Sequence, residues 1–406
     1  MNTTAVRKRL VARPHTGRFA ALEGYRAAAA LGVLLYHCAF ATGVVRPDAF
    51  GGILFENLGG FCVAVFFVMS GFLLYRPMCS NIFDEQPLPD RGQFIVRRLL
   101  RIYPGYWLAL IGWALVEPTV TTSRGNSWAI FLLLDSYVPP LQPYTGLSVA
   151  WTLSIEIAFY FSLVVIASIV AVASRRLATR RARLQLQFVV LAALAIGALV
   201  FLTTMHSSGE IVPAYRWIFS YFDWFALGML LAVLSAWTER GAALPAAVQG
   251  LLDHGEWCLV LAFGCYLGIA ASIDGQFGLS RFDTTAGAVY RHVAQGIAAA
   301  LLIAPAVLGR PDQFVVRTMT NRTLATLGVI SYGIYLWHNV VLSWLQQRTV
   351  IDGQLITFVW VTAVTLAVTL VLALISHRFV EVPASNLGRR RPHHHDRRAI
   401  TPAPVG

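Results

Sequence analysis

The chain has 406 residues, of which 57% are hydrophobic and only 13% are charged, and its mean hydropathy is +0.62. Soluble proteins carry about 25% charged residues, so this composition excludes an ordinary soluble domain and predicts an integral membrane protein. The net charge of +12 is explained by basic loops that contact anionic lipid, and we therefore expect no nucleic acid among the partners.

The apolar runs are long enough for helices and lack the alternation of an outer-membrane barrel. The sequence therefore predicts an all-α polytopic bundle of about ten transmembrane helices. The stretch 128–134 is too short to span, so we expect a re-entrant or interfacial piece there. The ten predicted spans are residues 20–45, 54–75, 103–120, 148–174, 185–205, 214–237, 256–273, 288–309, 323–346 and 354–379.

Basic residues predict the orientation of this bundle. With both termini in the cytoplasm, most of the 32 Lys and Arg residues fall on the inner side, as the positive-inside rule requires. We expect a basic cytoplasmic segment over residues 1–19, a transmembrane domain over 20–387, and a disordered basic cytoplasmic tail over 388–406.

The first predicted span contains Glu23, Arg26 and His37. Charged side chains are costly inside a membrane and usually have a function there. Arg26 and His37 are eleven residues apart, which brings a helix to within roughly 20° of its starting face, about 16 Å further along. We therefore predict that both side chains face the same cavity.

Arg98 and Arg101 precede the third predicted span and lie three residues apart, hence on one helix face at the expected cytoplasmic mouth. Paired guanidinium groups suit a phosphate-bearing ligand. The same pair could equally be a positive-inside stripe that contacts lipid head groups.

Later spans add three more polar residues, Glu156, Asp223 and His338. His338 has almost the same depth in the ninth span as His37 in the first, which favours a shared site. The two carboxylates, at similar depths in the fourth and sixth spans, could pair with Arg216, orient a histidine proton, or hold helices together. For Asp223 we favour the structural role. The sequence has no His-Glu-x2-His or Cys-x2-Cys motif, and we expect no metal.

Together these stretches resemble the membrane acyltransferase-3 family of integral O-acyltransferases, and the resemblance covers almost the whole chain. Glu23-Gly24-Tyr25-Arg26 stands where the family more often has Asp-Gly-Leu-Arg. Because the chain ends soon after the tenth predicted span, the single-domain form is implied. The matching stretches are Leu22 to Arg26 with His37, Phe66 to Leu73 with Ser70, Arg97 to Pro104, Trp151 to Tyr160, Ile330 to His338, and Val380 to Pro383.

The resemblance implies transfer of an acyl group, expected to be acetyl, from acyl-CoA to a hydroxyl of a glycan, glycolipid or natural product at the bacterial cytoplasmic membrane. His37 would be the general base, assisted by Glu156 or His338. Arg98 and Arg101 would hold the CoA phosphates. Arg26 and Ser70 would lie along the path of the pantetheine arm.

Two alternatives remain open from the residues alone. One is a non-catalytic membrane receptor or scaffold, for which basic inner loops would suffice, although polar residues concentrated at one depth do not favour it. The other is a transporter. A bundle with intramembrane Arg, Glu, Asp and His could be a proton-coupled transporter. The sequence has no obvious inverted pair of Gly- or Pro-broken segments, which favours the enzyme. It does not indicate the acceptor, the acyl chain length or the oligomeric state.

Overall fold

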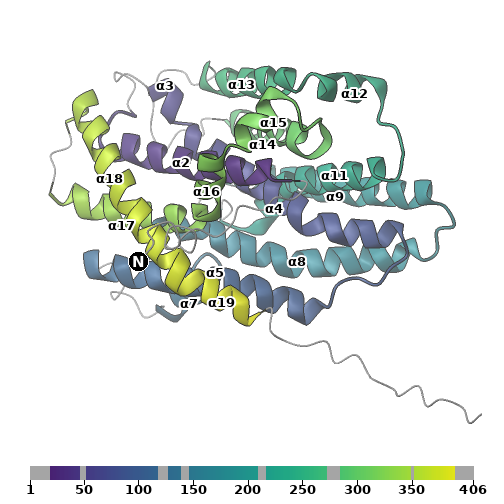
Figure 1. The fold of residues 1–406 in the computed structure, drawn as a ribbon, viewed down its shortest axis with the longest axis horizontal. Coiled ribbons are helices and arrows are strands. Elements are labelled where there is room, and N and C mark those ends of the chain that lie inside the picture. Colours follow the sequence, from purple (N-terminus) through teal and green to yellow (C-terminus); the bar gives the residue numbers. More distant parts are fainter. Residues whose placement is uncertain are drawn as a thin grey trace, which may run out of the picture.

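The computed structural model describes residues 19–45, 52–117, 127–138, 146–208, 216–271, 284–348 and 352–388, and these residues form helices joined by turns without any strand. Figure 1 shows the long helices running mostly along one axis, with α4 in contact with α2, α8, α9 and α11. The longer helices are α2 (Ala21–Ala41), α4 (Leu58–Phe83), α5 (Arg91–Val116), α8 (Trp151–Ser174), α9 (Arg180–Ser207), α11 (Phe222–Thr238), α13 (Gly255–Ala271), α14 (Thr285–Leu308), α17 (Ser331–Gln346) and α18 (Leu355–Ser376). The shorter elements are α3 (Gly52–Phe55), α7 (Ser127–Phe131), η1 (Ser148–Ala150), η2 (Ile218–Ser220), α12 (Ala246–Asp253), α15 (Phe314–Met319), α16 (Arg322–Val329), the π-helical η3 (His377–Glu381) and α19 (Val382–Leu387).

Each of the ten predicted spans contains a helix, and the all-α prediction is confirmed for the described residues. By length and hydropathy, six helices within these residues could cross a membrane, or seven if the bent pair α16 and α17 counts as one span. Helix α2 is not among the six, because Glu23, Arg26 and His37 lower its hydropathy. The number ten and the orientation stay predictions.

Two predicted spans differ in detail from the observed helices. The third span was expected to begin at residue 103, whereas α5 begins at Arg91, where the side chain of Asp90 caps the helix by accepting from Gln93 N at 2.6 Å. The ninth span was expected to be one helix, but the chain bends by 68° between α16 and α17. A hydropathy pattern predicts where long apolar segments lie, but it does not predict a bend within one of them.

The predicted short piece near residue 128 is the five-residue helix α7, which packs on α5. Side chains of α5 donate three hydrogen bonds to its carbonyl groups and to the turn that follows. These are Tyr106 Oη to Ile130 O at 2.6 Å, Trp107 Nε1 to Phe131 O at 2.9 Å, and Tyr103 Oη to Leu132 O at 2.8 Å. Backbone groups outside a long helix are therefore paired, as an apolar environment requires.

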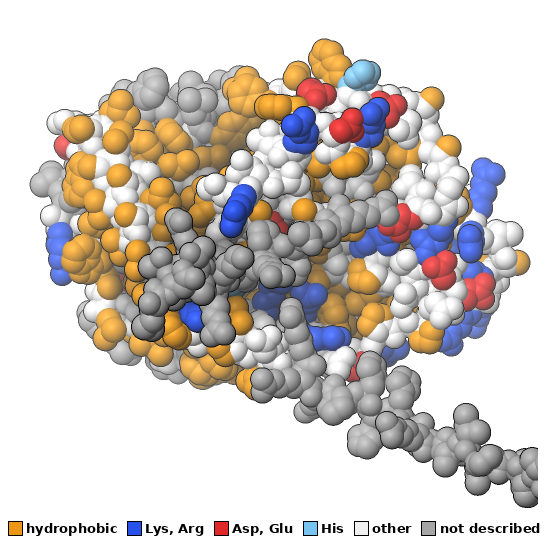
Figure 2. All heavy atoms as spheres, viewed as in Figure 1, with side chains coloured by type: hydrophobic (Ala, Val, Ile, Leu, Met, Phe, Trp, Pro, Cys, Tyr) orange, Lys and Arg blue, Asp and Glu red, His pale blue; other side chains and the backbone are white. Residues whose placement is uncertain are grey.

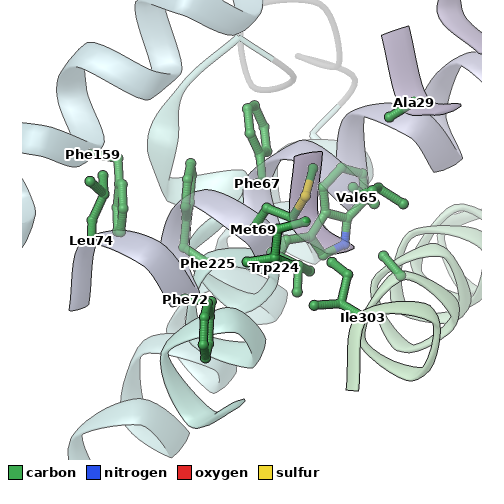
Figure 3. Packing of buried hydrophobic residues seen from close by; sticks show 14 of the residues in the cluster. Ala29, Val65, Phe67, Met69, Phe72, Leu74, Phe159, Trp224, Phe225 and Ile303 are labelled. Atoms are coloured by element: carbon green, nitrogen blue, oxygen red, sulfur yellow. The ribbon is translucent and has the colours of Figure 1, made fainter. Parts of the chain in front are cut away.

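The core is centred on the crossing of α4 and α11. Gly71 and Gly228 face the backbone of the opposite helix so closely that a Cβ atom at either position would overlap it. Small residues permit this approach in membrane proteins. Phe225 of α11 stacks between Phe67 of α4 and Phe159 of α8, with ring centroids 4.7 and 3.9 Å away (Figure 3). This crossing fixes α4 and α8, which both line the site described below.

Hydrophobic and basic side chains gather over different parts of the visible surface. Figure 2 shows hydrophobic side chains over much of the left part of this face and Lys and Arg gathered at the right, where α8 ends and α9 begins in Figure 1, with further charged side chains at the upper right. At this basic end, Arg240 pairs with Asp84 and Arg76 pairs with Glu239, which ties α4 to the end of α11. The basic end corresponds to the predicted cytoplasmic side. The predicted segments 1–19 and 388–406 lie outside the described residues except for Phe19 and Gly388.

Candidate functional site

A cavity of about 440 Å³ lies inside the bundle between α2, α4, α5, α8 and α17. Its polar lining includes three arginines and two glutamates, so basic groups exceed acidic groups by one. An apolar bundle does not retain five charged groups around one space without partners or a ligand. The charged and polar lining residues are Glu23, Arg26, Ser70, Arg98, Arg101, Thr152, Glu156, Tyr160, Ser331, Tyr332 and Tyr335.

The two glutamates are held by neighbours within the cavity. Glu23 lies 3.5 Å from Arg26, one helical turn along α2. Glu156 Oε1 accepts hydrogen bonds from Ser70 Oγ at 3.2 Å and from Tyr160 Oη at 2.7 Å. These contacts link α4 with α8 and hold the carboxylate in a defined position.

Arg98 and Arg101 lie together on the cavity side of α5, as their spacing predicted. Arg101 is exposed, whereas Arg98 is half-buried with its guanidinium 5.6 Å from the ring of Phe94. Arg98 Nε is buried without a hydrogen-bond partner among the described residues. An unpaired buried donor on a cation is costly, so this end of the cavity is suited to an anionic ligand.

A second unpaired group lines the same cavity. Ser331, the first residue of α17, is only 1% exposed, and its Oγ has no hydrogen-bond partner within the described part of the chain. The neighbouring Tyr332 is tied to α5, because its hydroxyl donates to Ile102 O at 2.6 Å. The bend between α16 and α17 places both residues on the cavity wall.

His37 of α2 and His338 of α17 lie in contact, with His338 Nε2 3.2 Å from His37 Nδ1. His338 Nδ1 lies 3.1 Å from Ile334 O, and His37 Nδ1 lies 2.9 Å from Val33 O. A carbonyl only accepts, so the proton of each neutral ring is on Nδ1. His37 Nδ1–H then faces both Val33 O and the unprotonated His338 Nε2, and the lone pair of His37 is left on Nε2.

The histidine pair does not line the cavity, but Tyr335 connects the two sites. The Tyr335 ring lines the cavity and lies 6.0 Å from the ring of His338 one turn later. Its hydroxyl bonds to Thr152 Oγ1 at 2.7 Å and donates to Val149 O at 2.9 Å. Phe66 packs on the same ring with centroids 5.9 Å apart. The Tyr335 ring therefore lies between the cavity and His338, with the Phe66 ring packed beside it.

Comparison with known proteins identifies the family. The acyltransferase domain of the acyltransferase-3 family matches residues 19–378. The chain belongs to this family. It is 27% identical over 387 residues to "Putative peptidoglycan O-acetyltransferase YrhL" of Bacillus subtilis strain 168, covering 91% of this chain and 55% of that protein. It is 23% identical over 389 residues to "Peptidoglycan O-acetyltransferase OatA" of Listeria monocytogenes, covering 90% of this chain and 56% of the relative.

The chain therefore spans about half the length of the curated relatives it matches. No solved structure matches the chain. The predicted acyltransferase-3 membership and the presence of an acyltransferase domain are confirmed. The apolar helices and the bacterial relatives support a multi-pass bacterial membrane protein.

The family's sequence motifs fall into two separate places in the structure. Five predicted residues share the cavity: Arg26, Ser70, Arg98, Arg101 and Glu156. The other two, His37 and His338, contact each other. The prediction that Arg26 and His37 face one cavity was wrong, because only Arg26 lines it. Arg26 and His37 lie on the same face of α2. Their separation of eleven residues places His37 beyond the cavity, in contact with His338.

Sequence reasoning missed some partners. Asp223 Oδ1 lies 3.0 Å from Nε2 of His292 on α14, a residue that was not singled out, and both side chains are buried. Trp224 stacks on the same imidazole at 4.4 Å, which fits the structural role favoured for Asp223. Tyr335 was also missed as a wall of the cavity, although its position three residues before His338 was a usable signal. Within the described ranges no cluster of His, Cys, Asp and Glu could hold a metal ion.

Proposed function

We propose that this chain is a membrane O-acyltransferase that moves an acetyl group from acetyl-CoA to a hydroxyl of a glycan acceptor. Family membership and two relatives named as peptidoglycan O-acetyltransferases support this reaction class. The observation that carries the proposal is the contact of His37 with His338, which leaves a lone pair on His37 Nε2.

In this proposal the donor binds in the arginine-lined cavity. Arg98 and Arg101 hold the CoA phosphates at the basic end, where Arg101 is exposed and Arg98 Nε is unpaired. Guanidinium groups bind phosphate with strong charge-assisted hydrogen bonds. The pantetheine arm then runs past Arg26 and Ser70 toward Tyr335. The acyl end then lies against Phe66 and Tyr335, and the Phe66 ring has to move aside for the acyl carbon to meet the acceptor oxygen at His37.

His37 acts as the general base in the chemical step. Its Nε2 takes the proton of the acceptor hydroxyl while the oxygen forms a bond to the acyl carbon. The carbon–sulfur bond breaks, and the CoA thiolate recovers the proton that His37 holds. His338 is a positioning residue, because its Nε2 accepts from His37 Nδ1–H and keeps the other nitrogen unprotonated.

In this proposal Glu156 acts at the donor site and does not assist His37 as the general base. It lies in the cavity with Ser70 and Tyr160, and no contact joins it to His37 among the described residues. We assign it to the donor site, where its charge offsets the arginines and its hydrogen bond orients Ser70. The acceptor reaches His37 from the side opposite the basic end, which is the outer face of the cytoplasmic membrane if the predicted orientation holds.

Radiolabelled acetyl-CoA tests the reaction class. The protein would be reconstituted in lipid nanodiscs with acetyl-CoA and soluble peptidoglycan fragments, and the products analysed by mass spectrometry. We expect fragments heavier by one acetyl unit and release of an equal amount of CoA. Proton-coupled movement of solute across sealed vesicles, without any cleavage of acetyl-CoA, would overturn the proposal in favour of a transporter.

A further inference from the structure

The cavity has one charged end and one apolar end. Its walls come from α2, α5 and α17, which run away from the basic end, and from α4 and α8, which run toward it. Arg98 and Arg101 therefore lie near the basic end, whereas residues early in α4 and α8 and further along α17 lie at the opposite end. Those residues are Val63, Phe66, Leu153, Thr152 and Tyr335.

The opposite end is closed by close-packed rings. Tyr335 is 7% exposed, and its hydroxyl is fixed by Thr152 and Val149. The Phe66 ring stands edge-on to it at an interplanar angle of 75°. Phe66 packs against both hydrophobic clusters of the bundle, the one around α4 and α11 and the one that includes Cys38 beside His37.

These two rings differ in how they are held. Tyr335 is anchored by hydrogen bonds to η1 and α8, whereas Phe66 is half-buried and held by packing alone. Val63 lies one turn earlier on α4 and is 7% exposed, and Leu153 of α8 is 4% exposed. The closed end is thus an apolar space with two different walls. Hydrogen bonds hold the Tyr335 wall in place, whereas the position of the Phe66 wall depends on the volume of its side chain.

We propose that this closed end is the acyl pocket and that Phe66, with Tyr335 behind it, restricts the donor to short acyl chains such as acetyl. The inference rests on the proposed function, in which the phosphates bind at Arg98 and Arg101. With the phosphates there, the acyl group points to the closed end. Each additional methylene then has to displace packed side chains, which close-packed interiors resist.

Binding of unreactive CoA thioethers tests the pocket without any acceptor. Affinities of purified protein for S-ethyl-CoA and S-hexyl-CoA would be measured. Because one methylene in an apolar pocket changes selectivity by about 10-fold to 200-fold, we expect the wild type to bind S-ethyl-CoA at least about tenfold more tightly. Phe66→Ala should reduce this preference by about tenfold or more, and Leu153→Ala should act in the same direction.

Phe61→Ala is the matched control. Phe61 lies on the same helix, packs against Tyr266 at 5.6 Å and does not line the cavity, so the chain-length preference should be unchanged. A wild type without preference, or a preference that survives both Phe66→Ala and Leu153→Ala, would overturn the acyl pocket. If Phe66→Ala does not fold, the chain-length preference of the wild type and of Leu153→Ala tests the acyl pocket.

Unmodified CoA separates this inference from the proposed function. If Arg98→Ala weakens CoA binding while the chain-length preference survives both Phe66→Ala and Leu153→Ala, the acyl pocket is wrong and the donor site stands. If Arg98→Ala leaves CoA binding unchanged, the donor site is wrong and the acyl pocket falls with it.

Discussion

The cavity and the histidine pair occupy successive depths of the same two helices, α2 and α17, yet they are built differently. The cavity contains five charged side chains, and Arg98 Nε and Ser331 Oγ remain unpaired in it. His338 is fully buried, and each imidazole of the pair bonds to a carbonyl one turn earlier in its own helix.

This difference indicates which region depends on a ligand. Unpaired buried groups cost free energy that a bound substrate recovers, so the cavity is incomplete without its ligand. The histidine pair is complete by itself except at His37 Nε2, the atom that a general base needs. Substitutions in the two regions should therefore separate donor binding from the chemical step.

The largest effect is expected at the base. His37→Ala and His37→Gln should lower the rate of acetyl transfer by about 10²-fold to 10⁴-fold, because general base catalysis contributes that much. Binding of CoA to the purified variants, measured by calorimetry, should match the wild type. His254→Ala removes an exposed histidine of the α12–α13 turn and serves as the control. Full activity of either His37 variant would contradict the base assignment.

His338→Ala should have a smaller effect on the same step. His37 keeps Val33 O as an acceptor for Nδ1–H but loses the second acceptor that fixes its ring. We expect kcat to fall by roughly 10-fold to 100-fold, as for other groups that orient a functional histidine. The KM for acetyl-CoA should not change, and the pH profile of kcat should be altered. If the KM for acetyl-CoA rose as much as kcat fell, the substitution would have disturbed the packing of Tyr335 at the cavity wall.

Arg98→Ala should affect the other region. Hydrogen bonds to charged groups contribute about 1.5 to 3 kcal/mol, so the KM for acetyl-CoA should rise by about tenfold or more with little change in kcat. Arg97→Ala is a matched control, since Arg97 is adjacent on α5, exposed, and bonded to Gln93 O at 3.2 Å away from the cavity. Equal effects of both variants would indicate general attraction of CoA to a basic surface.

The smallest effect is expected at the ion pair between Asp84 and Arg240, which lies outside both regions. The hydrogen bond from Arg240 holds the pKa of Asp84 below its ordinary value. Asp84 therefore contributes stability that is fully present above the ordinary Asp pKa of about 3.9 and is lost as the pH falls through the lower folded-state pKa. Because the pair is partly exposed, Asp84→Asn should cost at most about 1 kcal/mol in thermal unfolding at pH 7.

Asp84→Asn should also leave CoA binding and transfer unchanged. The difference in stability from the wild type should shrink as the pH falls through the lowered folded-state pKa of Asp84, and disappear below it, where the carboxylate is protonated in both states. A variant as stable as the wild type at pH 7 would show that this ion pair contributes nothing measurable. Reduced donor binding in Asp84→Asn would instead connect this ion pair to the cavity.

The sequence by itself determined the helices and the family. Apolar length located a helix in each of the ten predicted stretches, and motif spacing selected Arg26, His37, Arg98, Arg101 and His338. The three-residue spacing of Arg98 and Arg101 was enough to place them on one face, because helical geometry relates residues that are close in the chain.

The tertiary structure decided which faces meet. The 68° bend before α17, the contact of His338 rather than Glu156 with His37, and the ring of Tyr335 between the cavity and His338 were not contained in any local pattern. Helical periodicity predicts which face of its own helix a side chain occupies, but not which neighbouring helix that face meets. How far each helix is rotated and shifted against its neighbours depends on close packing of many distant residues, such as Gly71 against Phe225 and Gly228 against Val68.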